Sequence, residues 1–427
     1  MKVQGCGTTD VGRKRDHNED SILVDLELGL YAVADGMGGH AAGEVASSHA
    51  IETVRGAIIA RRDVIEDFQQ ADTHETRERL VTMVETAIQK ACAEIYSLAT
   101  KDQGKAGMGT TFSMVLVVGS KALMAHVGDS RVFLARQGQL HQLSEDHSYC
   151  AEMIKRGKMT REEARRSPYS NVITRAVGIQ ASVQVDTLLF DIIPSDAFLI
   201  CTDGLHIYMD DPNELVEKLT AGARDDSVPK TLVDLANNRG GRDNISAVVL
   251  QVVPERDQVV EDNRRAQEVN LKLETLKKIP LFRHLTYQEL VKVLNITYLE
   301  THEAGSVIVR EGEEGEELYV VLAGLVSVMI GPQRIADLGA GIHFGEMALI
   351  DQSPRSATIA AKEQTRVLVI GRRPFYNLIR KEPVLAVKLL WSFVQVLSRR
   401  LRETNEQLSG ARNELEQIQQ VPFLEVE

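Results

Sequence analysis

The chain has 427 residues, of which 43% are hydrophobic and 26% are charged, and its formal net charge is -12. This length exceeds one ordinary domain and predicts two or three, and the composition is that of a globular protein. The negative charge argues against a nucleic-acid partner, because an acidic surface repels a phosphate backbone.

The first 20 residues are polar and do not form a secretory signal. No apolar run approaches the roughly 18 residues that span a bilayer. The four cysteines lie far apart in the sequence, which is typical neither of a disulfide framework nor of a metal cluster. We therefore expect a protein of the reducing cytoplasm without a membrane anchor.

In the first 250 or so residues, short apolar runs alternate with amphipathic stretches. The runs predict strands, several of them apolar throughout, as expected where both faces of a sheet are covered. Gln137 and Gly138 separate two alternating segments and predict a hairpin. Helical patterns occupy 41–60, 74–99, 213–220 and 228–237. These elements predict a mixed α/β domain with layered sheets.

Residues 254–274 are dense in charge, contain no glycine and have proline only at Pro254. This composition predicts a stiff helical linker. Short strands separated by glycine turns then follow a helical pattern, which is typical of a small β-barrel or jelly roll. The predicted limits are therefore 1–253 for the first domain, 254–274 for the linker and 275–384 for the second domain.

The last segment, 385–420, is a predicted helix with a heptad repeat. Its apolar seam consists of Val387, Leu390, Val394, Leu397, Leu401, Thr404, Leu408, Ala411, Leu415 and Ile418. A helix lying on its own domain would explain the first turns. The outer repeats have too little chain left to pack against, so the pattern favours a homodimer through this helix.

Aspartates recur at the ends of the apolar runs. Three of them stand next to a glycine at the end of a run, and the fourth lies just before the last run of the first domain: Asp35, Asp129, Asp203 and Asp243. One Asp-Gly pair is usually a plain turn. Four such aspartates, with Glu19 and Asp20 upstream, would repel one another unless a cation lay among them. Oxygen ligands without a Cys or His cluster point to Mg²⁺ or Mn²⁺.

The motifs "RDHNED", "VADGMGGH", "MGTTFSMVLV", "HVGDSR", "SEDHS", "NVITRAVG", "CTDGL" and "GRDNISAVV" occur in this order. Over residues 1–253 the chain resembles the bacterial branch of the metal-dependent type 2C (PPM) serine/threonine protein phosphatases. The resemblance implies an α+β fold, a four-layer α/β/β/α sandwich with metals at one end. It also implies metal-dependent hydrolysis of phosphoserine and phosphothreonine, with phosphoproteins as substrates.

The resemblance assigns metal-binding roles to individual positions. Asp35 matches the catalytic carboxylate that bridges two metals, and Gly36 matches the residue whose carbonyl faces one of them. Asp203 and Asp243 match ligands of the first metal. Asp129 matches the ligand of a weaker third metal, shared with Asp203.

Three further positions match the family. Glu19 and Asp20 match acidic residues that hold metal-bound waters. Arg15 matches the catalytic arginine that grips the substrate phosphate, for which its planar fork is suited. Between two divalent ions a water loses its proton near neutral pH. The resemblance implies that this water attacks phosphorus without a covalent enzyme intermediate.

One position departs from the family pattern. Animal members usually carry histidine directly after the Asp-Gly pair, where this chain has Met37, and the nearest histidine is His40. A general acid and a solvated loop residue are equally open roles for His40. The charged stretch 145–178 matches the family's flap, which we expect to shape substrate choice.

A second phosphate-binding pattern is "FGEMALIDQSPRSAT", residues 344–358. A surface ion pair between Glu346 and Arg355 is the ordinary interpretation. In the functional interpretation Gly345 and neighbouring N–H groups face an anion that Arg355 neutralises, and Glu346 accepts a hydrogen bond from a sugar hydroxyl.

Residues 279–400 resemble the cyclic nucleotide-binding domains of catabolite activator proteins and of cyclic-nucleotide-dependent kinases. The resemblance implies that Glu346 contacts the ribose 2′-OH and that Arg355 contacts the cyclic phosphate. The hydroxyl of Ser356 fits either the phosphate or a guanine edge. Both cAMP and cGMP are therefore candidate ligands, with cAMP favoured.

The expected function is a Mn²⁺- or Mg²⁺-dependent phosphoprotein phosphatase regulated by a cyclic nucleotide. One alternative is a constitutive phosphatase whose barrel serves only dimerisation or partner binding, and Glu346 and Arg355 argue against it. Another alternative is a non-catalytic nucleotide-sensing scaffold. The complete acidic set argues against that alternative.

Overall fold

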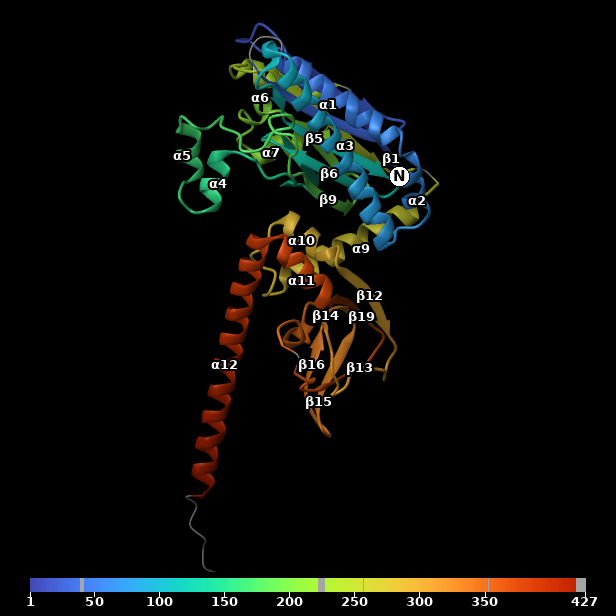
Figure 1. Ribbon diagram of the computed structural model, residues 1–427. Coiled ribbons are helices and arrows are strands. Elements are labelled where there is room, and N and C mark those ends of the chain that lie inside the picture. Colours follow the sequence, from blue (N-terminus) through green and yellow to red (C-terminus); the bar gives the residue numbers. More distant parts are fainter. Residues whose placement is uncertain (39–41, 222–226, 256, 352, 420–427) are drawn as a thin grey trace, which may run out of the picture. The chain divides into compact units, whose positions relative to one another are not determined.

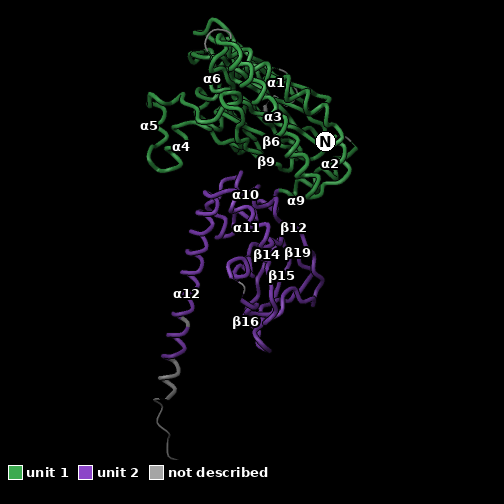
Figure 2. The backbone as a smooth tube through the Cα atoms, in the orientation of Figure 1, with its two compact units in different colours: residues 1–269 green, residues 270–427 purple. Residues whose placement is uncertain are grey.

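The computed structural model describes residues 1–38, 42–221, 227–255, 257–351 and 353–419. The chain divides into two compact units, Met1–Val269 and Asn270–Glu427 (Figure 2). Helix α9, Val259–Lys278, crosses the limit between them. The domain limits drawn from the sequence remain predictions.

Unit 1 contains two antiparallel sheets (Figure 1). The five-stranded sheet has the order β1 (Lys2–Asp10), β11 (Ile245–Val253), β10 (Ala197–Cys201), β7 (Arg131–Arg136) and β8 (Gln139–Gln142). The six-stranded sheet has the order β2 (Asp20–Asp25), β3 (Leu30–Met37), β5 (Phe112–Val118), β6 (Lys121–Val127) and β9 (Asp186–Asp191), with β4 (Gly109–Thr110) paired to β3.

Helices cover the outer face of each sheet of unit 1. The six-stranded sheet carries α1 (Ala42–Ile59), α2 (Arg62–Gln70) and α3 (His74–Lys101), and the five-stranded sheet carries α6 (Asp203–His206), α7 (Pro212–Ala221) and α8 (Ser227–Asn238). Two short helices, α4 (Tyr149–Lys155) and α5 (Arg161–Arg166), and the turn η1 (Gln103–Lys105) complete the unit.

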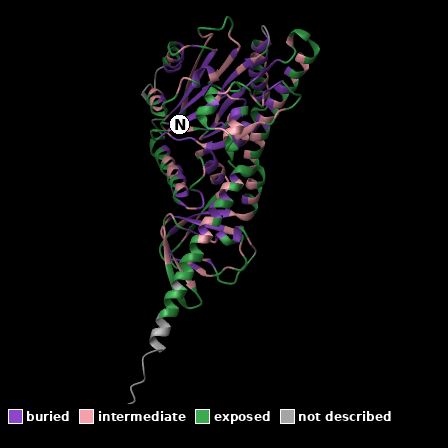
Figure 3. Cartoon of the chain, turned by 90° about the vertical axis from the view of Figure 1, so that its left-hand side faces the viewer, coloured by how far each residue is buried: buried purple, intermediate pink, exposed green. Residues whose placement is uncertain are grey.

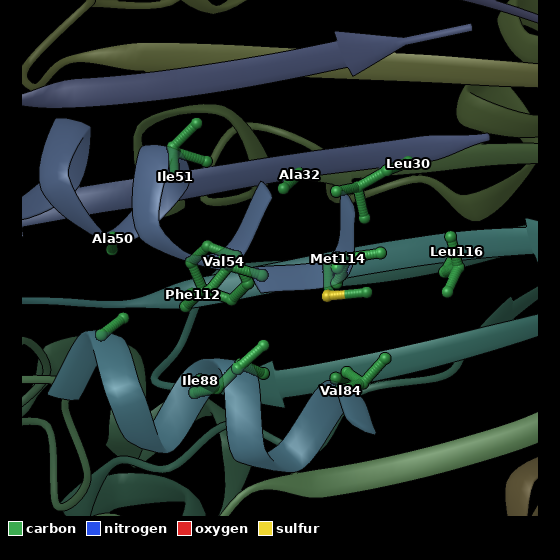
Figure 4. Close-up of a cluster of buried hydrophobic side chains, with 14 of the residues drawn as sticks. Leu30, Ala32, Ala50, Ile51, Val54, Val84, Ile88, Phe112, Met114 and Leu116 are labelled. Atoms are coloured by element: carbon green, nitrogen blue, oxygen red, sulfur yellow. The ribbon is translucent and has the colours of Figure 1, made fainter. Parts of the chain in front are cut away.

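The helix-facing core of the six-stranded sheet shows why these segments pack together. Alternate residues of β3 and β5, such as Ala32 and Met114, meet the apolar stripes of α1 and α3, such as Val54 and Ile88 (Figure 4). The opposite strand faces meet each other, as where Phe190 of β9 lies 5.9 Å from the ring of Phe198 of β10. The predicted four-layer α/β/β/α sandwich is confirmed.

The predicted hairpin is also confirmed, since β7 and β8 pair with Arg136 opposite Gln139. The two residues between them, Gln137 and Gly138, have φ of 51° and 73°. Positive φ at both central positions makes the tight turn whose twist matches that of paired strands.

Unit 2 is built on two four-stranded sheets. One has the order β12 (Thr297–His302), β19 (Thr365–Gly371), β14 (Glu317–Ala323) and β17 (His343–Phe344), and the other β13 (Val307–Val309), β18 (Thr358–Ala361), β15 (Leu325–Ile330) and β16 (Gln333–Gly339). One buried cluster that includes Val321, Val326 and Val367 draws on both sheets. This agrees with the predicted jelly-roll type of domain, with two facing sheets in place of one closed barrel.

The helices of unit 2 are α10 (Tyr287–Leu294), the 3₁₀ turn η2 (Glu346–Leu349), α11 (Arg372–Lys381) and α12 (Pro383–Gln419). One face of α12 is buried, with Phe393 lying 6.4 Å from the ring of Phe375 in α11. None of the helices described by the structure is long and apolar enough to cross a lipid bilayer.

The heptad seam of α12 lies mostly on the exposed side of the helix (Figure 3). Val387, Leu390, Leu401 and Leu408 are each more than 60% exposed. The side chains of Leu415 and Ile418 lie outside the described residues. The described part of the chain therefore leaves much of the seam uncovered.

We expect Phe112→Ala to lower the unfolding free energy by about 3–5 kcal/mol, because it removes a fully buried ring from the core of unit 1. Ile59→Ala, at the half-exposed end of α1, is the control and should cost less than about 1 kcal/mol. Urea denaturation followed by far-UV circular dichroism measures both values. Equal losses would contradict this description of the core.

Candidate metal centre and phosphate pocket

Strand register brings the predicted carboxylates of unit 1 to one edge of the sandwich. Asp20 stands opposite Asp35 in the β2–β3 pair. Cys201 stands opposite Ala247 in the β10–β11 pair, so the segments around Asp203 and Asp243 meet at the end of these strands. The backbones there approach closely, because a Cβ on Gly204 would lie 1.9 Å from the carbonyl oxygen of Asn244.

Asp20 connects the two sheets through its side chain. Its Oδ2 accepts hydrogen bonds from the hydroxyls of Thr202 at 2.8 Å and Ser246 at 2.7 Å. Its Oδ1 is buried and has no hydrogen-bond partner among the described residues. Burial, opposed by these two hydrogen bonds and assisted by nearby carboxylates, raises the pKa of Asp20 to about 7. A buried oxygen of this kind is costly unless water or a cation satisfies it.

The neighbouring aspartates also have raised pKa values. Burial, together with the charges of Asp20 and Asp203, holds the pKa of Asp35 well above its usual value. Burial and the charge of Asp203 raise the pKa of Asp129 to about 7. Burial and the charge of Asp243 raise the pKa of Asp203 to about 6. These carboxylates therefore repel one another at close range.

Polar side chains fix the loop that carries Asp129. The imidazole Nε2 of His206 lies 3.0 Å from the Asp129 carbonyl oxygen. The hydroxyl of Thr111 accepts a hydrogen bond from the Asp35 N–H at 2.9 Å and lies 2.8 Å from the Ser130 hydroxyl. The loops of Asp35 and Asp129 are thus held to each other by side chains that carry no charge.

The segment before β2 is fastened to the same edge by Asn244. Its Oδ1 accepts from the Glu19 N–H at 2.8 Å, and its Nδ2 donates to the carbonyls of Val11 and His17 at 3.0 and 2.9 Å. This arrangement places Arg15 beside Asp243, with the guanidinium 2.8 Å from the carboxylate.

Glu19 and Gly36 also lie at this edge. Burial raises the pKa of Glu19, with Arg15 opposing the rise and Asp243 adding to it. The Gly36 N–H donates to the Glu19 carbonyl at 3.1 Å. A Cβ on Gly36 would lie 2.1 Å from the carbonyl oxygen of Gly43, so no side chain fits there.

The charge balance of this edge fits a divalent cation. Among the described residues, no three His, Cys, Asp or Glu side chains stand in a preformed metal-ligand geometry. The edge instead combines mutually repelling carboxylates with the unpartnered Oδ1 of Asp20. Mg²⁺ or Mn²⁺, which bind oxygen ligands, would reduce the repulsion between the carboxylates and satisfy the Asp20 oxygen. His40 lies outside the described residues.

In unit 2 the predicted phosphate pocket is compact. Gly345 has φ of 77°, and a Cβ there would lie 2.7 Å from a guanidinium nitrogen of Arg355. Arg355 donates to the Glu317 carbonyl at 2.9 Å and lies 3.2 Å from the Glu317 carboxylate. Its guanidinium also stands over the ring of Tyr319. Ser356 is exposed.

The second predicted contact residue of this pocket is also engaged. Glu346 is buried and forms an ion pair with Arg400 of α12. Burial and the charge of Arg400 lower the pKa of the neighbouring His343 to about 4, so this imidazole is neutral at pH 7. The ordinary alternative, an ion pair between Glu346 and Arg355, is not observed, because the two residues form separate pairs, Glu346–Arg400 and Glu317–Arg355.

Several residues of these two sites were not identified from the sequence: Thr202, Ser246, Asn244, His206, Glu317 and Arg400. Most follow or precede a predicted residue by one or a few positions, which signals proximity but no role. Their roles depend on strand register and on where α12 lies, which local sequence does not show.

Two family models match the chain. The model for protein phosphatase 2C matches residues 10–236, and the model for the cyclic nucleotide-binding domain matches residues 299–382. The serine/threonine phosphatase stp of Listeria monocytogenes is 34% identical over 246 residues, which cover 57% of this chain and 93% of that protein. The protein phosphatase PhpP of Streptococcus pneumoniae is 34% identical over 247 residues, covering 57% and 95%.

Solved structures give the same picture. The Mycobacterium tuberculosis serine/threonine phosphatase PstP/Ppp superposes with a TM-score of 0.51 at 30% identity, covering 60% of this chain and 100% of that chain. A Streptococcus agalactiae serine/threonine phosphatase superposes with a TM-score of 0.50 at 34% identity, covering 58% and 99%.

We expect Asp35→Asn to raise the unfolding free energy by about 1 kcal/mol in the presence of a chelator, because it removes one charge from a repelling set. Asp186→Asn is the contrasting variant. The Asp186 carboxylate lies 3.0 Å from His147 and 2.8 Å from Arg175, so its loss should cost about 1–3 kcal/mol. Urea denaturation in chelator measures both, and two losses of equal size would contradict repulsion at Asp35.

Proposed function

This chain belongs to the protein phosphatase 2C family, and we propose that it hydrolyses phosphoserine and phosphothreonine in proteins with the aid of two divalent metal ions, and a weaker third, under the control of a cyclic nucleotide. The family model covers residues 10–236, and relatives of 34% identity are named serine/threonine phosphatases. The observation that carries the proposal is the carboxylate edge, where the unpartnered Asp20 oxygen belongs to a carboxylate near Asp35 and where Arg15 lies beside Asp243.

We assign the metal-holding residues by their place at this edge. Asp35, Asp203 and Asp243 would supply carboxylate ligands, and the Gly36 carbonyl would supply a further oxygen. Asp129 would hold the third ion. Bound Mn²⁺ or Mg²⁺ lowers the pKa of water and neutralises charge on a phosphoryl group.

The acidic pair at the start of β2, Glu19 and Asp20, would hold water rather than metal directly. Asp20 has one oxygen fixed by two hydroxyls and one free, so it can accept a hydrogen bond from a water at a fixed position. Glu19 directly precedes Asp20, the first residue of β2, and burial raises the pKa of Glu19.

Arg15 is placed to bind the substrate phosphate. Its side chain is half exposed and bonds Asp243 on one side only, which leaves guanidinium donors for an incoming anion. A planar guanidinium can hold two phosphate oxygens at once. Arg15 would therefore fix the orientation of the phosphoryl group next to Asp35.

We expect hydrolysis of phosphothreonine peptides to require added Mn²⁺ or Mg²⁺ and to stop in chelator. Asp35→Asn should reduce kcat/KM by about a thousandfold or more, because the carboxylate between the two ions is lost. Steady-state phosphate release measures both effects. Full activity in chelator would contradict the metal-dependent reaction.

Arg15→Ala is the matched variant for the phosphate contact. Since Arg15 would bind a phosphate present in both substrate and transition state, the main effect should be a higher KM. A collapsed kcat at unchanged KM would show that Arg15 has another role.

The second part of the proposal is regulation by cAMP or cGMP through the cyclic nucleotide-binding domain. Glu346 would accept a hydrogen bond from the ribose, and Arg355 and the Gly345 N–H would bind the phosphate. Both charged residues already have protein partners, Arg400 and Glu317. A nucleotide would have to exchange both ion pairs, which links ligand binding to the position of α12.

This exchange offers a route for control. A nucleotide that takes Glu346 releases Arg400, which lies on the long helix α12. Allosteric coupling is typically ~1–3 kcal/mol, so a several-fold change in the rate of hydrolysis is expected. A constitutive phosphatase with a domain used only for dimerisation is the competing function.

We expect Arg355→Ala to abolish nucleotide binding and the response of hydrolysis to nucleotide, because the cyclic phosphate loses its cation. Arg400→Ala should raise nucleotide affinity a few-fold, since Glu346 no longer has a competing partner. Arg373→Ala, an exposed arginine of α11, is the control and should change neither. Calorimetry with cAMP and cGMP measures affinity, and no binding of either at millimolar concentration would favour the constitutive phosphatase.

We also propose a parallel homodimer through α12. Val387, Leu390, Leu401 and Leu408 of the seam are exposed while the opposite face of the helix is buried within unit 2, so this part of the seam is available to a second copy. The four cysteines are all free thiols, which suits the cytoplasm.

Light scattering of the intact chain should give about twice 47.3 kDa. Leu401→Asn with Leu408→Asn should shift the chain toward monomer, because two seam leucines that are each 63% exposed in one chain lose their apolar partners. Glu403→Ala with Glu406→Ala changes exposed positions outside the seam and should leave the mass unchanged. A monomeric intact chain at micromolar concentration would refute the dimer.

A further inference from the structure

The flap of unit 1 carries a charge opposite to that of the unit around it. Unit 1 contains 30 basic and 41 acidic residues, a net charge of -11. Within it, residues 155–166 contain six basic residues and two acidic ones, a net charge of +4. All six basic residues of this segment are exposed. The segment is therefore a positive surface on a negative unit.

Half of these cations already have partners. Lys155 lies 2.6 Å from Glu145, Arg156 lies 3.4 Å from Glu152, and Arg165 lies 2.7 Å from Asp210. In each of these pairs the carboxylate belongs to a residue outside 155–166.

The other three cations remain available. The side chains of Lys158, Arg161 and Arg166 form no ion pair and no hydrogen bond with any residue that the structure describes. The Glu163 carboxylate is occupied, since it accepts from the N–H and hydroxyl of Thr160 at 2.7 and 2.9 Å in the capping box of α5. The two carboxylates of the segment, Glu162 and Glu163, do not balance its six basic residues.

Specific contacts build this surface. The Ser148 hydroxyl caps α4, and the Thr160 hydroxyl caps α5. The thiol of Cys150 in α4 is buried and lies 3.5 Å from the carbonyl of Tyr169, which follows α5. The rings of Tyr149 and Tyr169 meet edge to face at 5.5 Å. The cations therefore stand on two short helices with fixed ends.

The base of the flap joins the edge that carries the proposed metal ligands. The His147 N–H donates to the Gly128 carbonyl at 2.7 Å, and the Gly128 N–H donates to His147 Nδ1 at 3.1 Å. Asp129 directly follows this contact. Arg165 reaches Asp210 in the loop after α6, the helix that begins at Asp203. Figure 1 shows α4 and α5 standing out from the sandwich on the side of α7.

We propose that Lys158, Arg161 and Arg166 bind acidic residues that flank the phosphorylated serine or threonine, so that the enzyme selects acidic phosphopeptides. The inference rests on the proposed phosphatase function. An acidic peptide is repelled by most of unit 1, and the flap offers it a local attraction beside the site of hydrolysis. An anionic membrane would match the same charge, but the attachment of the flap to the Asp129 loop favours the substrate.

Three phosphothreonine peptides of equal length, flanked by glutamate, glutamine or lysine, test the proposal on the full-length protein with Mn²⁺. Three exposed ion pairs correspond to roughly a three- to thirty-fold preference in kcat/KM for the glutamate peptide over the lysine peptide. The preference should appear mainly in KM and should shrink between about 0.05 M and about 0.5 M salt, because exposed charges are screened.

The variant Lys158→Gln, Arg161→Gln, Arg166→Gln should abolish the preference. Lys2→Gln, Arg61→Gln, Arg62→Gln removes the same charge from exposed positions in β1 and at the start of α2, and this variant should keep the preference. p-Nitrophenyl phosphate has no flanking residues, so both variants should hydrolyse it at the wild-type rate.

The following outcomes would contradict the proposal. Equal kcat/KM for the three peptides, or an equal loss of preference in the control variant, would overturn flap docking while leaving the phosphatase function intact. Sedimentation with phosphatidylserine vesicles, together with no peptide preference, would assign the surface to a membrane instead. Failure to hydrolyse any peptide or p-nitrophenyl phosphate would overturn the phosphatase function itself.

Discussion

Unit 1 is organised around the carboxylate of Asp20, which ties its two sheets together and yet remains incompletely satisfied. One oxygen accepts from Thr202 and Ser246 of the other sheet, and the second oxygen is buried without a partner among the described residues. Apolar packing alone would hold the sandwich together, as the clusters under the helices show. The buried carboxylate at the edge of the sandwich lowers the free energy of unfolding. It also provides a hydrogen-bond acceptor at a fixed position in the site.

The same logic explains why small and uncharged residues surround the acidic ones. Gly36 and Gly204 lie so close to backbone carbonyls that a Cβ would collide, and this closeness is what lets the loops of Asp35 and Asp203 converge. Thr111 then holds the loop of Asp35, and Asn244 holds the segment before β2, with neutral hydrogen bonds. A lysine at either position would neutralise the carboxylates and remove their attraction for a cation.

The sequence singled out aspartates that the structure brings close together, because an aspartate at the end of an apolar strand is a local signal. It also predicted the layers of unit 1, since strand and helix periodicities are local. It could not predict that Thr202 and Ser246 reach Asp20, because that depends on how β10 and β11 align against β2. Likewise, the sequence predicted Glu346 and Arg355 as nucleotide contacts, but it could not predict that each forms an ion pair within unit 2, because those partners follow only from tertiary packing.

The two phosphate sites of this chain solve opposite electrostatic problems. The edge of unit 1 keeps carboxylates unneutralised, so the proposed cations, together with Arg15, would be needed to hold a phosphate there. In unit 2 the guanidinium of Arg355 is neutralised by Glu317, so the proposed nucleotide would gain only the difference between two ion pairs. A net-negative unit also disfavours anionic substrates at long range, and this is the constraint that a positive flap would offset. Selectivity for acidic flanking residues then follows from the same charge balance that makes the metal site possible.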